Sequence, residues 1–459
     1  MGAITQVVGL GSYAEAYREL EHRTLQQPDW LRTLRQNAFA RFCDVGFPTL
    51  KDEDWRFTNV AAIARETFSP AADRSSEFAR ERLEPFRMPG AACMLVFVNG
   101  HFAPQLSERA DCAATVEAGG LAEALSSNAV ALQSHMGRYL NTQRDAFCSL
   151  NTAFLEDGAY IRIPKGTVLK APLHLLFVSV GNGEPQIAYP RNLIVAETGT
   201  QVDIVEEHVS LGEGVFFSNL VTELVAEENA VVSHHVIERE NREAFHVSTL
   251  RIQQARSANV RSHSVLLGAA LVRNNIHPVL AGEGAECLLN GLFVGEQHQH
   301  MDNYMLLEHV SPHCNSRQFY NGILDGEAHG VFHGRIIVHK DAQKTDAKQT
   351  NRNLLLSDST QIDTKPQLEI YADDVKCTHG ATIGQVDEEA LFYLRSRGIE
   401  EGSARKLLLF AFAGECLGRM AEGAARTHIE SIIHQSLPGG VNPTIGRGLE
   451  TGRAWEEVR

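Results

Sequence analysis

The sequence lacks the features that mark nucleic-acid-binding and membrane-spanning proteins. Its 42 Lys and Arg residues are outnumbered by 57 Asp and Glu residues, which gives a formal net charge of -15. It contains no basic tract that would neutralise a run of phosphates. It also contains no apolar run approaching the roughly 20 residues that a transmembrane helix needs. We therefore expect neither nucleic acid nor a membrane as a partner.

Disulfide, export and nucleotide-binding signals are also missing. The 8 cysteines include no C-x-x-C pair, and a chain of 459 residues is large enough to fold without disulfides. The first residues carry no cationic export segment, and Gln6 stands where a myristoylation signal would have Ser or Thr. These absences predict a reducing, cytoplasmic location. The phosphate-binding pattern G-x-x-x-x-G-K-[ST] is absent, so any ATP chemistry must come from another subunit.

Aromatic residues are scarce, at 7%, whereas the 37 glycines suit a structure rich in tight turns. The spacing of apolar residues predicts an N-terminal helical region over residues 1–155, with a break near Pro28. One short strand is expected within it at Cys93–Val98, followed by a hairpin turn at Asn99 and Gly100.

Residues 156–385 consist of short Val-, Ile- and Leu-rich runs separated by Gly, Asn, Asp and Ser. Turn-then-strand units recur first at intervals of 30, 28, 27 and 29 residues, opening near Gly199, Asn229, Ser257, Gly284 and His313. Later units follow at intervals of 15, 17, 15 and 14 residues, near Ala328, Thr345, Thr360 and Asp374. Since the second interval is about half the first, we predict a β-helix whose coil holds two strands. A β-sandwich or barrel is the alternative.

Residues 386–459 are expected to form a C-terminal helical domain and a polar tail. The segment from Asp387 has acidic residues in its first turn and arginines in its last, as a short helix should. In the next predicted helix, apolar residues at 407–413 cover every side. A helix that is apolar all round must be buried, so we expect a partner helix on one face and a partner protein on another.

The strongest local candidate for chemistry is Cys377-Thr378-His379-Gly380. Residues two apart on a strand project from the same face, about 6.5 Å apart, so the thiolate of Cys377 and the imidazole of His379 would face one metal or iron–sulfur assembly. Two ligands do not complete a site. The alternative is a buried, inert Cys377 beside a solvated His379.

Two further groups of residues suggest rival functions. Histidines are concentrated in one stretch and would form a metal-binding row if coils stacked them: His298, His300, His309, His313, His329, His333 and His339. Acidic residues of the β region invite comparison with the paired carboxylates of solenoid polysaccharide enzymes: Asp203, Glu206, Asp341, Asp346, Asp358 and Asp363. A stable histidine-rich metalloprotein and a β-solenoid carbohydrate-active enzyme are therefore the alternatives.

Three segments carry a resemblance to a known family. They are LKDEDWRFTNV at residues 50–60, GVFHGRIIVHKDAQKTDAKQTNRNLLLS, and EIYADDVKCTHGATIGQVDEEALFYLRSRGI. Together they closely resemble the SufB/SufD family of iron–sulfur cluster assembly proteins, and the similarity spans nearly the whole chain. The length, the helical lead-in and CTHG followed by ATIG are more similar to the SufD branch than to SufB.

The resemblance implies a right-handed parallel β-helix flanked by helical regions, in a scaffold subunit without catalytic residues or ATPase activity of its own. It implies pairing with SufB through the β-helices and binding of the ATPase SufC by the C-terminal helices. The apolar residues expected to contact SufC are Leu407, Leu408, Phe410 and Phe412. A homodimer in the absence of SufB is the other expected state.

The resemblance also assigns roles to the CTHG residues. By residue match, His379 takes the position of the histidine that meets a SufB cysteine where the nascent cluster forms, so it is the candidate metal ligand, with Cys377 beside it. Thiolates are the usual cluster ligands and imidazole can replace them. No cofactor is expected to stay bound to the chain alone. The complex would hold a transient iron–sulfur cluster at the SufB interface and also reduced flavin, although the sequence has no flavin motif.

Overall fold

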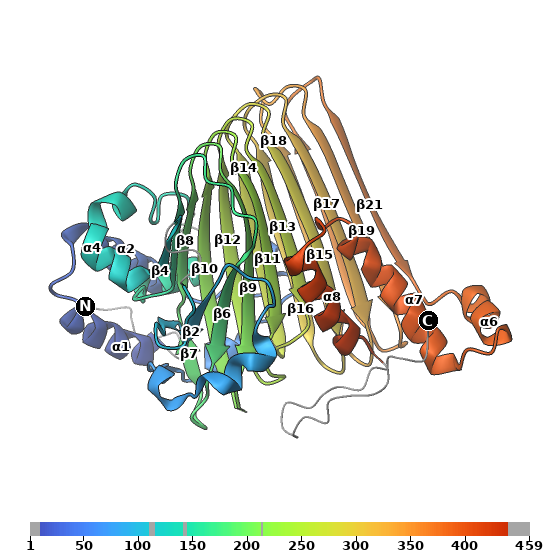
Figure 1. Ribbon diagram of the computed structural model, residues 1–459, viewed down its shortest axis with the longest axis horizontal. Helices are drawn as coiled ribbons and strands as arrows, with labels where there is room; N and C mark the ends of the chain where they lie inside the picture. The colour runs from blue at the N-terminus through green and yellow to red at the C-terminus, as the bar shows by residue number, and fades with distance from the viewer. Residues whose placement is uncertain (1–9, 110–114, 141–144, 213, 439–459) are drawn as a thin grey trace.

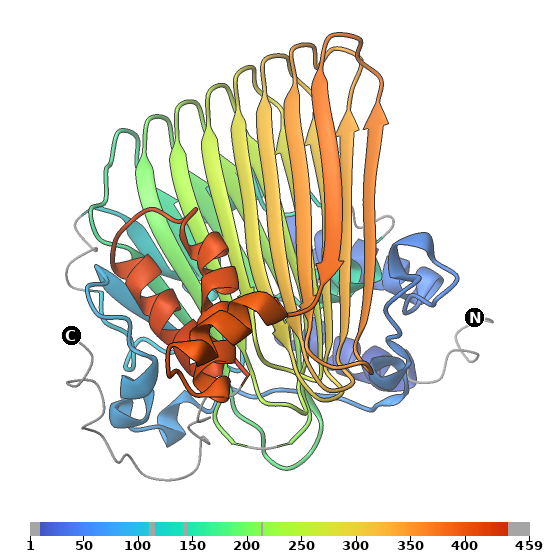
Figure 2. The same ribbon diagram turned by 90° about the vertical axis from the view of Figure 1, so that its right-hand side faces the viewer.

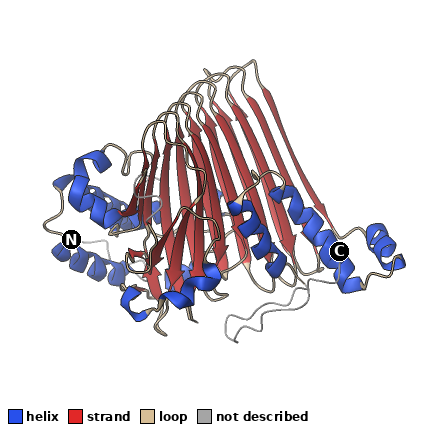
Figure 3. Ribbon diagram, in the orientation of Figure 1, coloured by secondary structure: helices blue, strands red, loops and turns tan. Residues whose placement is uncertain are grey.

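The computed structural model describes residues 10–109, 115–140, 145–212 and 214–438. Its centre is a solenoid of two facing sheets, with helices at its N-terminal end and against one flank (Figures 1 and 3). The pairings between successive coils are parallel, which confirms the predicted parallel β-helix. No helix in the described part of the chain is both long and apolar enough to cross a membrane.

From residue 191 to residue 384 the strands alternate between the two sheets, so each coil in this range contributes one strand to each sheet. The ten-stranded sheet contains, in spatial order, β21 (Lys376–Gly384), β19 (Asp346–Leu355), β17 (Asn315–Leu324), β15 (Glu286–Gly295), β13 (Asn259–Leu266), β11 (Val231–Arg239), β9 (Gln201–Ser210), β6 (Leu173–Ser179), β2 (Cys93–Val98) and β3 (His101–Phe102). The eleven-stranded sheet contains β20 (Gln361–Ile370), β18 (His329–Val338), β16 (His300–His309), β14 (Leu271–Leu280), β12 (Phe245–Gln254), β10 (Phe216–Ala226), β8 (Arg191–Ala196), β5 (Ala159–Ile163) and β4 (Glu117–Gly120). In addition, β7 (Gln186–Ala188) pairs with β10, and β1 (Ser69–Pro70) pairs with β7.

The longer sequence interval is one coil of the solenoid. The five turn residues that mark it have φ values from 55° to 71° and precede strands of the ten-stranded sheet: Gly199, Asn229, Ser257, Gly284 and His313. Each turn is hydrogen-bonded to the corresponding turn of the next coil. For example, the Asn229 N–H donates to the carbonyl of Arg256 at 3.0 Å. The shorter interval arises because the later marks include turns into both sheets, as at β18, β19, β20 and β21.

The α-helices of the N-terminal region pack on the outer face of the eleven-stranded sheet, whereas Leu83 and Phe86 pack on β2, β6 and β9 of the ten-stranded sheet. The helices of this region are α1 (Leu10–Arg23), α2 (Asp29–Val45), α3 (Ala61–Arg65), α4 (Leu121–Gln133) and α5 (Ala146–Ala153), with short 3-10 helices at Glu53–Trp55, Ser75–Glu77 and Arg80–Phe86. The predicted hairpin is present, with φ values of 52° at Asn99 and 85° at Gly100. Strand β2 also pairs in parallel with β6, so this region adds strands to the solenoid.

The segment LKDEDWRFTNV fastens the N-terminal region to the solenoid. The Arg273 guanidinium of β14 lies over the rings of Trp55 and Tyr304, at 4.3 and 4.6 Å from their centroids. It also forms a buried ion pair with Asp302 of β16, and the Thr58 hydroxyl donates to the same carboxylate. A buried charge needs such partners, so these contacts fix the segment across β14 and β16.

The C-terminal helices are α6 (Glu388–Ser396), α7 (Glu401–Leu417) and α8 (Ala424–Ser436). Figure 2 shows α7 and α8 across the outer face of the ten-stranded sheet, where Leu409 and Ile433 join one hydrophobic cluster with Leu292 and Val294 of β15. A buried polar contact adds to this packing, because His428 of α8 lies 3.0 Å from a carboxylate oxygen of Glu207 on β9. The face of α7 that carries Leu409, Ala413 and Cys416 is therefore covered within the chain.

Candidate functional site

The C-terminal end of the solenoid presents two terminal strands. In the described part of the chain, β20 pairs in its sheet with β18 alone, and β21 pairs with β19 alone. Pro366 lies within β20, as expected only for an edge strand, because proline has no N–H for the ladder. Strand β21 contains no proline, so its free edge keeps its backbone donors and acceptors.

Cys377 and His379 both lie on β21, as the alternation predicted. Cys377 is opposite Ala347 in the register and packs half-buried against the hydrophobic cluster between the two sheets. His379 is exposed, and its position two residues along places it on the same, inward face at the open end. The two side chains therefore belong to one surface at the mouth of the solenoid interior.

The chemistry of this pair is that of an incomplete ligand set. Burial raises the pKa of the Cys377 thiol, so the side chain is not an activated thiolate. The groups of described residues that could hold a metal within this chain are His174, Glu207 and His428, and Glu238, Glu240 and His246, and they include neither Cys377 nor His379. No described residues of this chain complete a metal or cluster ligand set at His379.

Most histidines of the histidine-rich stretch contact a partner residue of their own. The rings of His300 and His329 lie edge to face with centroids 4.8 Å apart. Adjacent coils therefore bring these two histidines together, as the repeat suggested. Each also has its own partner, however, because His300 contacts Thr58 and His329 contacts Asp363. The remaining contacts are His298 with Glu327, His309 with Ser316, His333 with Gln367 and His339 with Glu308, while His313 occupies a turn.

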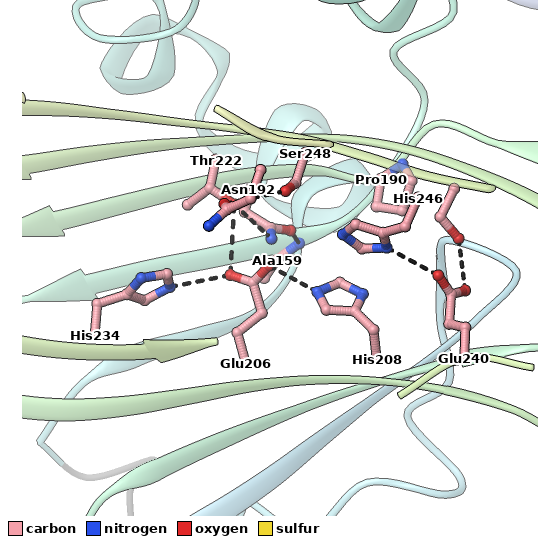
Figure 4. A network of polar contacts seen from close by, with 12 residues as sticks. Ala159, Pro190, Asn192, Glu206, His208, Thr222, His234, Glu240, His246 and Ser248 are labelled. Atoms are coloured by element: carbon pink, nitrogen blue, oxygen red, sulfur yellow. Dashed lines mark hydrogen bonds and ion pairs between the residues drawn. The ribbon is translucent and has the colours of Figure 1, made fainter. Parts of the chain in front are cut away.

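The six acidic residues have different surroundings and different partners. Asp346 pairs with Arg317, and Asp363 pairs with His329. Glu206 is buried between the sheets, where His208 and His234 lie 2.9 and 3.1 Å from its oxygens (Figure 4). Burial alone would raise the pKa of Glu206, but these hydrogen bonds outweigh it and hold the pKa below its usual range. Asp203, Asp341 and Asp358 lie at turns or strand positions outside this network.

The interior network was missed from the sequence. It joins Glu206 to His208 and, through a T-shaped ring contact at 4.9 Å, to His246, which bonds Glu240 (Figure 4). These residues come from β9, β11 and β12 and from the segment between them, and they meet only because the coils stack in register. The sequence pattern that could have indicated this network is the placement of acidic residues and histidines at alternate positions of otherwise apolar strands.

The expected SufC-contacting residues differ in their surroundings. Phe410 stacks on His434 of α8 with ring centroids 3.6 Å apart, and Phe412 lies under the Arg352 guanidinium. Leu407 is 51% exposed and Leu408 is half-buried. The neighbouring α6 exposes 72% of Phe392 and 57% of Tyr393. The C-terminal helices thus expose three large apolar side chains, Phe392 and Tyr393 on α6 and Leu407 on α7.

Comparisons with known proteins agree over nearly the whole chain. Residues 177–412 match the family model described as the SufBD core domain of SUF system FeS cluster assembly, and residues 10–175 match the SufBD protein N-terminal region. A SufBD family protein of Synechocystis is 36% identical over 87% of this chain and 89% of its own length. The iron–sulfur cluster assembly protein SufD of Escherichia coli is 30% identical over 95% of this chain and 100% of its own, and Bacillus subtilis SufD is 24% identical over 90% and 95%. The chain therefore belongs to the SufBD family of iron–sulfur cluster assembly proteins.

Proposed function

We propose that this chain is the SufD-type scaffold subunit of a SUF assembly complex and has no ATPase activity of its own. It pairs with SufB, binds the ATPase SufC, and supplies His379 to a nascent cluster at the SufB interface. The observation that carries the proposal is the placement of His379 on a terminal strand whose other edge is unpaired in the described chain. A cluster ligand in that position is accessible to a second solenoid.

The open end supports SufB as the partner that completes the ligand set. Cys377 and His379 provide two donor side chains on one face, and a cluster needs more. Because the Cys377 thiol is half-buried with a raised pKa, His379 is the principal ligand from this chain and Cys377 contributes less. The cluster is then cargo that forms at the interface, and reduced flavin, if bound, belongs to the full complex.

The exposed side chains of Phe392, Tyr393 and Leu407 support SufC as the second partner. Exposed aromatic side chains are enriched at protein interfaces, and these lie on helices outside the solenoid. We assign the N-terminal region 1–155 to closing one end of the solenoid, the core 156–385 to cluster assembly and residues 386–459 to SufC binding. We propose a cytoplasmic location for the complex, in keeping with the free thiols of Cys148, Cys287, Cys314 and Cys416.

Co-expression with candidate SufB and SufC proteins tests this proposal. A tag on this chain should retain both proteins through affinity purification and gel filtration, and the complex should assemble a cluster when supplied with iron, sulfide and ATP. The chain purified alone should be colourless and should not hydrolyse ATP. Stoichiometric iron and sulfide on the isolated chain, or retention of neither protein, would contradict the proposal.

A further inference from the structure

A column of three polar residues leads from the solenoid interior to His379. Gln318 of β17 is opposite Gln349 of β19, and Gln349 is opposite His379 of β21. Neighbouring strands are about 4.8 Å apart, so these side chains lie one above another on the inward face. Gln318 and Gln349 are only 2% and 1% exposed. The amide of Gln349 is therefore the buried group next to the His379 side chain.

The side-chain oxygen of Gln349 receives no hydrogen bond from any described residue. Its Nε2 donates to Oε1 of Gln318 at 2.5 Å, whereas its own Oε1 is buried without a hydrogen-bond partner among the described residues. Buried amide oxygens are rarely left unpaired. The His379 imidazole likewise lacks a side-chain hydrogen bond in the part of the chain that the structure describes. A free acceptor and a free donor thus occupy adjacent positions in one column.

A glycine across the interior makes room for this amide pair. A Cβ atom built on Gly334 of β18 would lie 2.0 Å from Nε2 of Gln349 and 3.1 Å from Oε1 of Gln318. Any larger residue at position 334 would displace the Gln349 side chain. The space opposite Gln349 is therefore shaped to hold its amide in one place.

We propose that Gln349 is a positioning residue for His379, whose ring N–H donates to Oε1 of Gln349 so that the other ring nitrogen presents its lone pair to iron. This role rests on the proposed function of His379. Histidines that bind metals usually donate their second ring N–H to an oxygen acceptor, which fixes the tautomer and the ring orientation. Gln318 holds Gln349 by accepting its N–H.

The same solenoid already pairs a glutamine with a histidine across adjacent strands. Nε2 of His333 on β18 lies 2.9 Å from Oε1 of Gln367 on β20. That pair is diagonal, because His333 is opposite Lys365 in the register, whereas Gln349 is directly opposite His379. At the open end, the neutral amide of Gln349 would orient His379 without adding a charge.

Two substitutions at Gln349 test the role in the full complex. Gln349→Met keeps the side-chain length but removes the acceptor, and it should lower the cluster assembly rate on the order of tenfold. Gln349→Glu is the conservative variant that keeps an acceptor, and it should restore most of the rate. Gln254→Met is the matched control, because Gln254 is also buried with an unpartnered Oε1 but lies away from His379. It should leave assembly per folded complex unchanged.

A double substitution separates positioning from a structural effect. In a His379→Ala background, Gln349→Met should cause no further loss of assembly, because its effect acts through His379. Gly334→Ala, which displaces Gln349, should reproduce the Gln349→Met defect. If Gln349→Met assembles clusters at the normal rate while His379→Ala is defective, only the positioning role of Gln349 is overturned. The same holds if the double variant loses more activity than His379→Ala alone. Normal assembly by His379→Ala would overturn the proposed function and this role with it.

Discussion

The imidazoles of His235 and His263 stack with ring centroids 4.9 Å apart on the outer face of the ten-stranded sheet. Both are buried, and Asn290 connects His263 to the backbone carbonyl of Cys416 on α7. Burial lowers the pKa of His235 well below its usual range and that of His263 to about 3. The packing of the C-terminal helices on the solenoid thus depends on two uncharged histidines.

Acid should therefore destabilise the protein. An unfolded histidine takes up a proton below about pH 6.5, whereas these folded histidines do not, so their stabilising contribution is full above that pH and falls as the pH drops toward the folded values. His263→Asn should reduce the loss of unfolding free energy between pH 7.5 and pH 5 by on the order of 2 kcal/mol. Chemical denaturation at both pH values measures this. The control Val130→Ser, at an exposed and non-titrating site, should leave the pH dependence unchanged, and an equal change in both variants would contradict this explanation.

The segment at residues 50–60 should contribute to stability through Arg273. Arg273→Ala leaves Asp302 buried without its cation, and breaking a buried ion pair in this way costs about 3 to 5 kcal/mol. Arg256→Ala is the matched control, because Arg256 pairs with Glu228 at an exposed site, and it should cost less than about 1 kcal/mol. Urea unfolding compares the two variants, and equal costs would show that the segment is not fastened as described.

Substitutions on α6 should weaken SufC binding without unfolding the chain. Replacing Phe392 and Tyr393 together by serine removes exposed aromatic area, so the unfolding free energy should change by about 0.5 kcal/mol or less at each site. The exposed Val130→Ser on α4 is the control. Deleting residues 387–459 is a poorer test, because α7 and α8 cover apolar residues of the sheet. Undiminished retention of SufC by the double variant would place its site elsewhere.

Cys377 should react slowly with alkylating reagents. Burial raises the pKa of its thiol, so the reactive thiolate is scarcer at pH 7.5 than in an unfolded chain. Iodoacetamide labelling followed by peptide mass spectrometry should show several-fold slower modification of Cys377 in the native protein than in urea. Faster modification in the native state would indicate an activated thiolate and a larger role for Cys377 in cluster assembly.

The sequence was sufficient to predict the repeating part of the fold. Turn residues such as Asn229 and His313 recur at each coil because the chain needs a positive φ there, and this requirement leaves a visible interval. The positions of Cys377 and His379 on one strand face followed from the two-residue alternation. Both predictions depend on local geometry alone.

The interior contacts could not be predicted in the same way. Glu206 meets His234, and Gln349 lies beside His379, only because of the register between coils some 30 residues apart, which the sequence pattern leaves undetermined. The partners of the apolar helix α7 within the chain could not be predicted either: His434 stacks on Phe410, and the Arg352 guanidinium lies over Phe412. Such pairings depend on tertiary packing.

The cluster assembly rate of the complex carrying His379→Ala shows whether His379 is a ligand of the nascent cluster. His379 is exposed, so its loss should change the melting temperature little and leave the complex intact on gel filtration. The account predicts a loss of cluster formation on the order of tenfold or more, with a smaller effect of Cys377→Ala and none of the control His313→Ala. Assembly at the normal rate by the intact His379→Ala complex, or a loss fully matched by dissociation of the subunits, would contradict it.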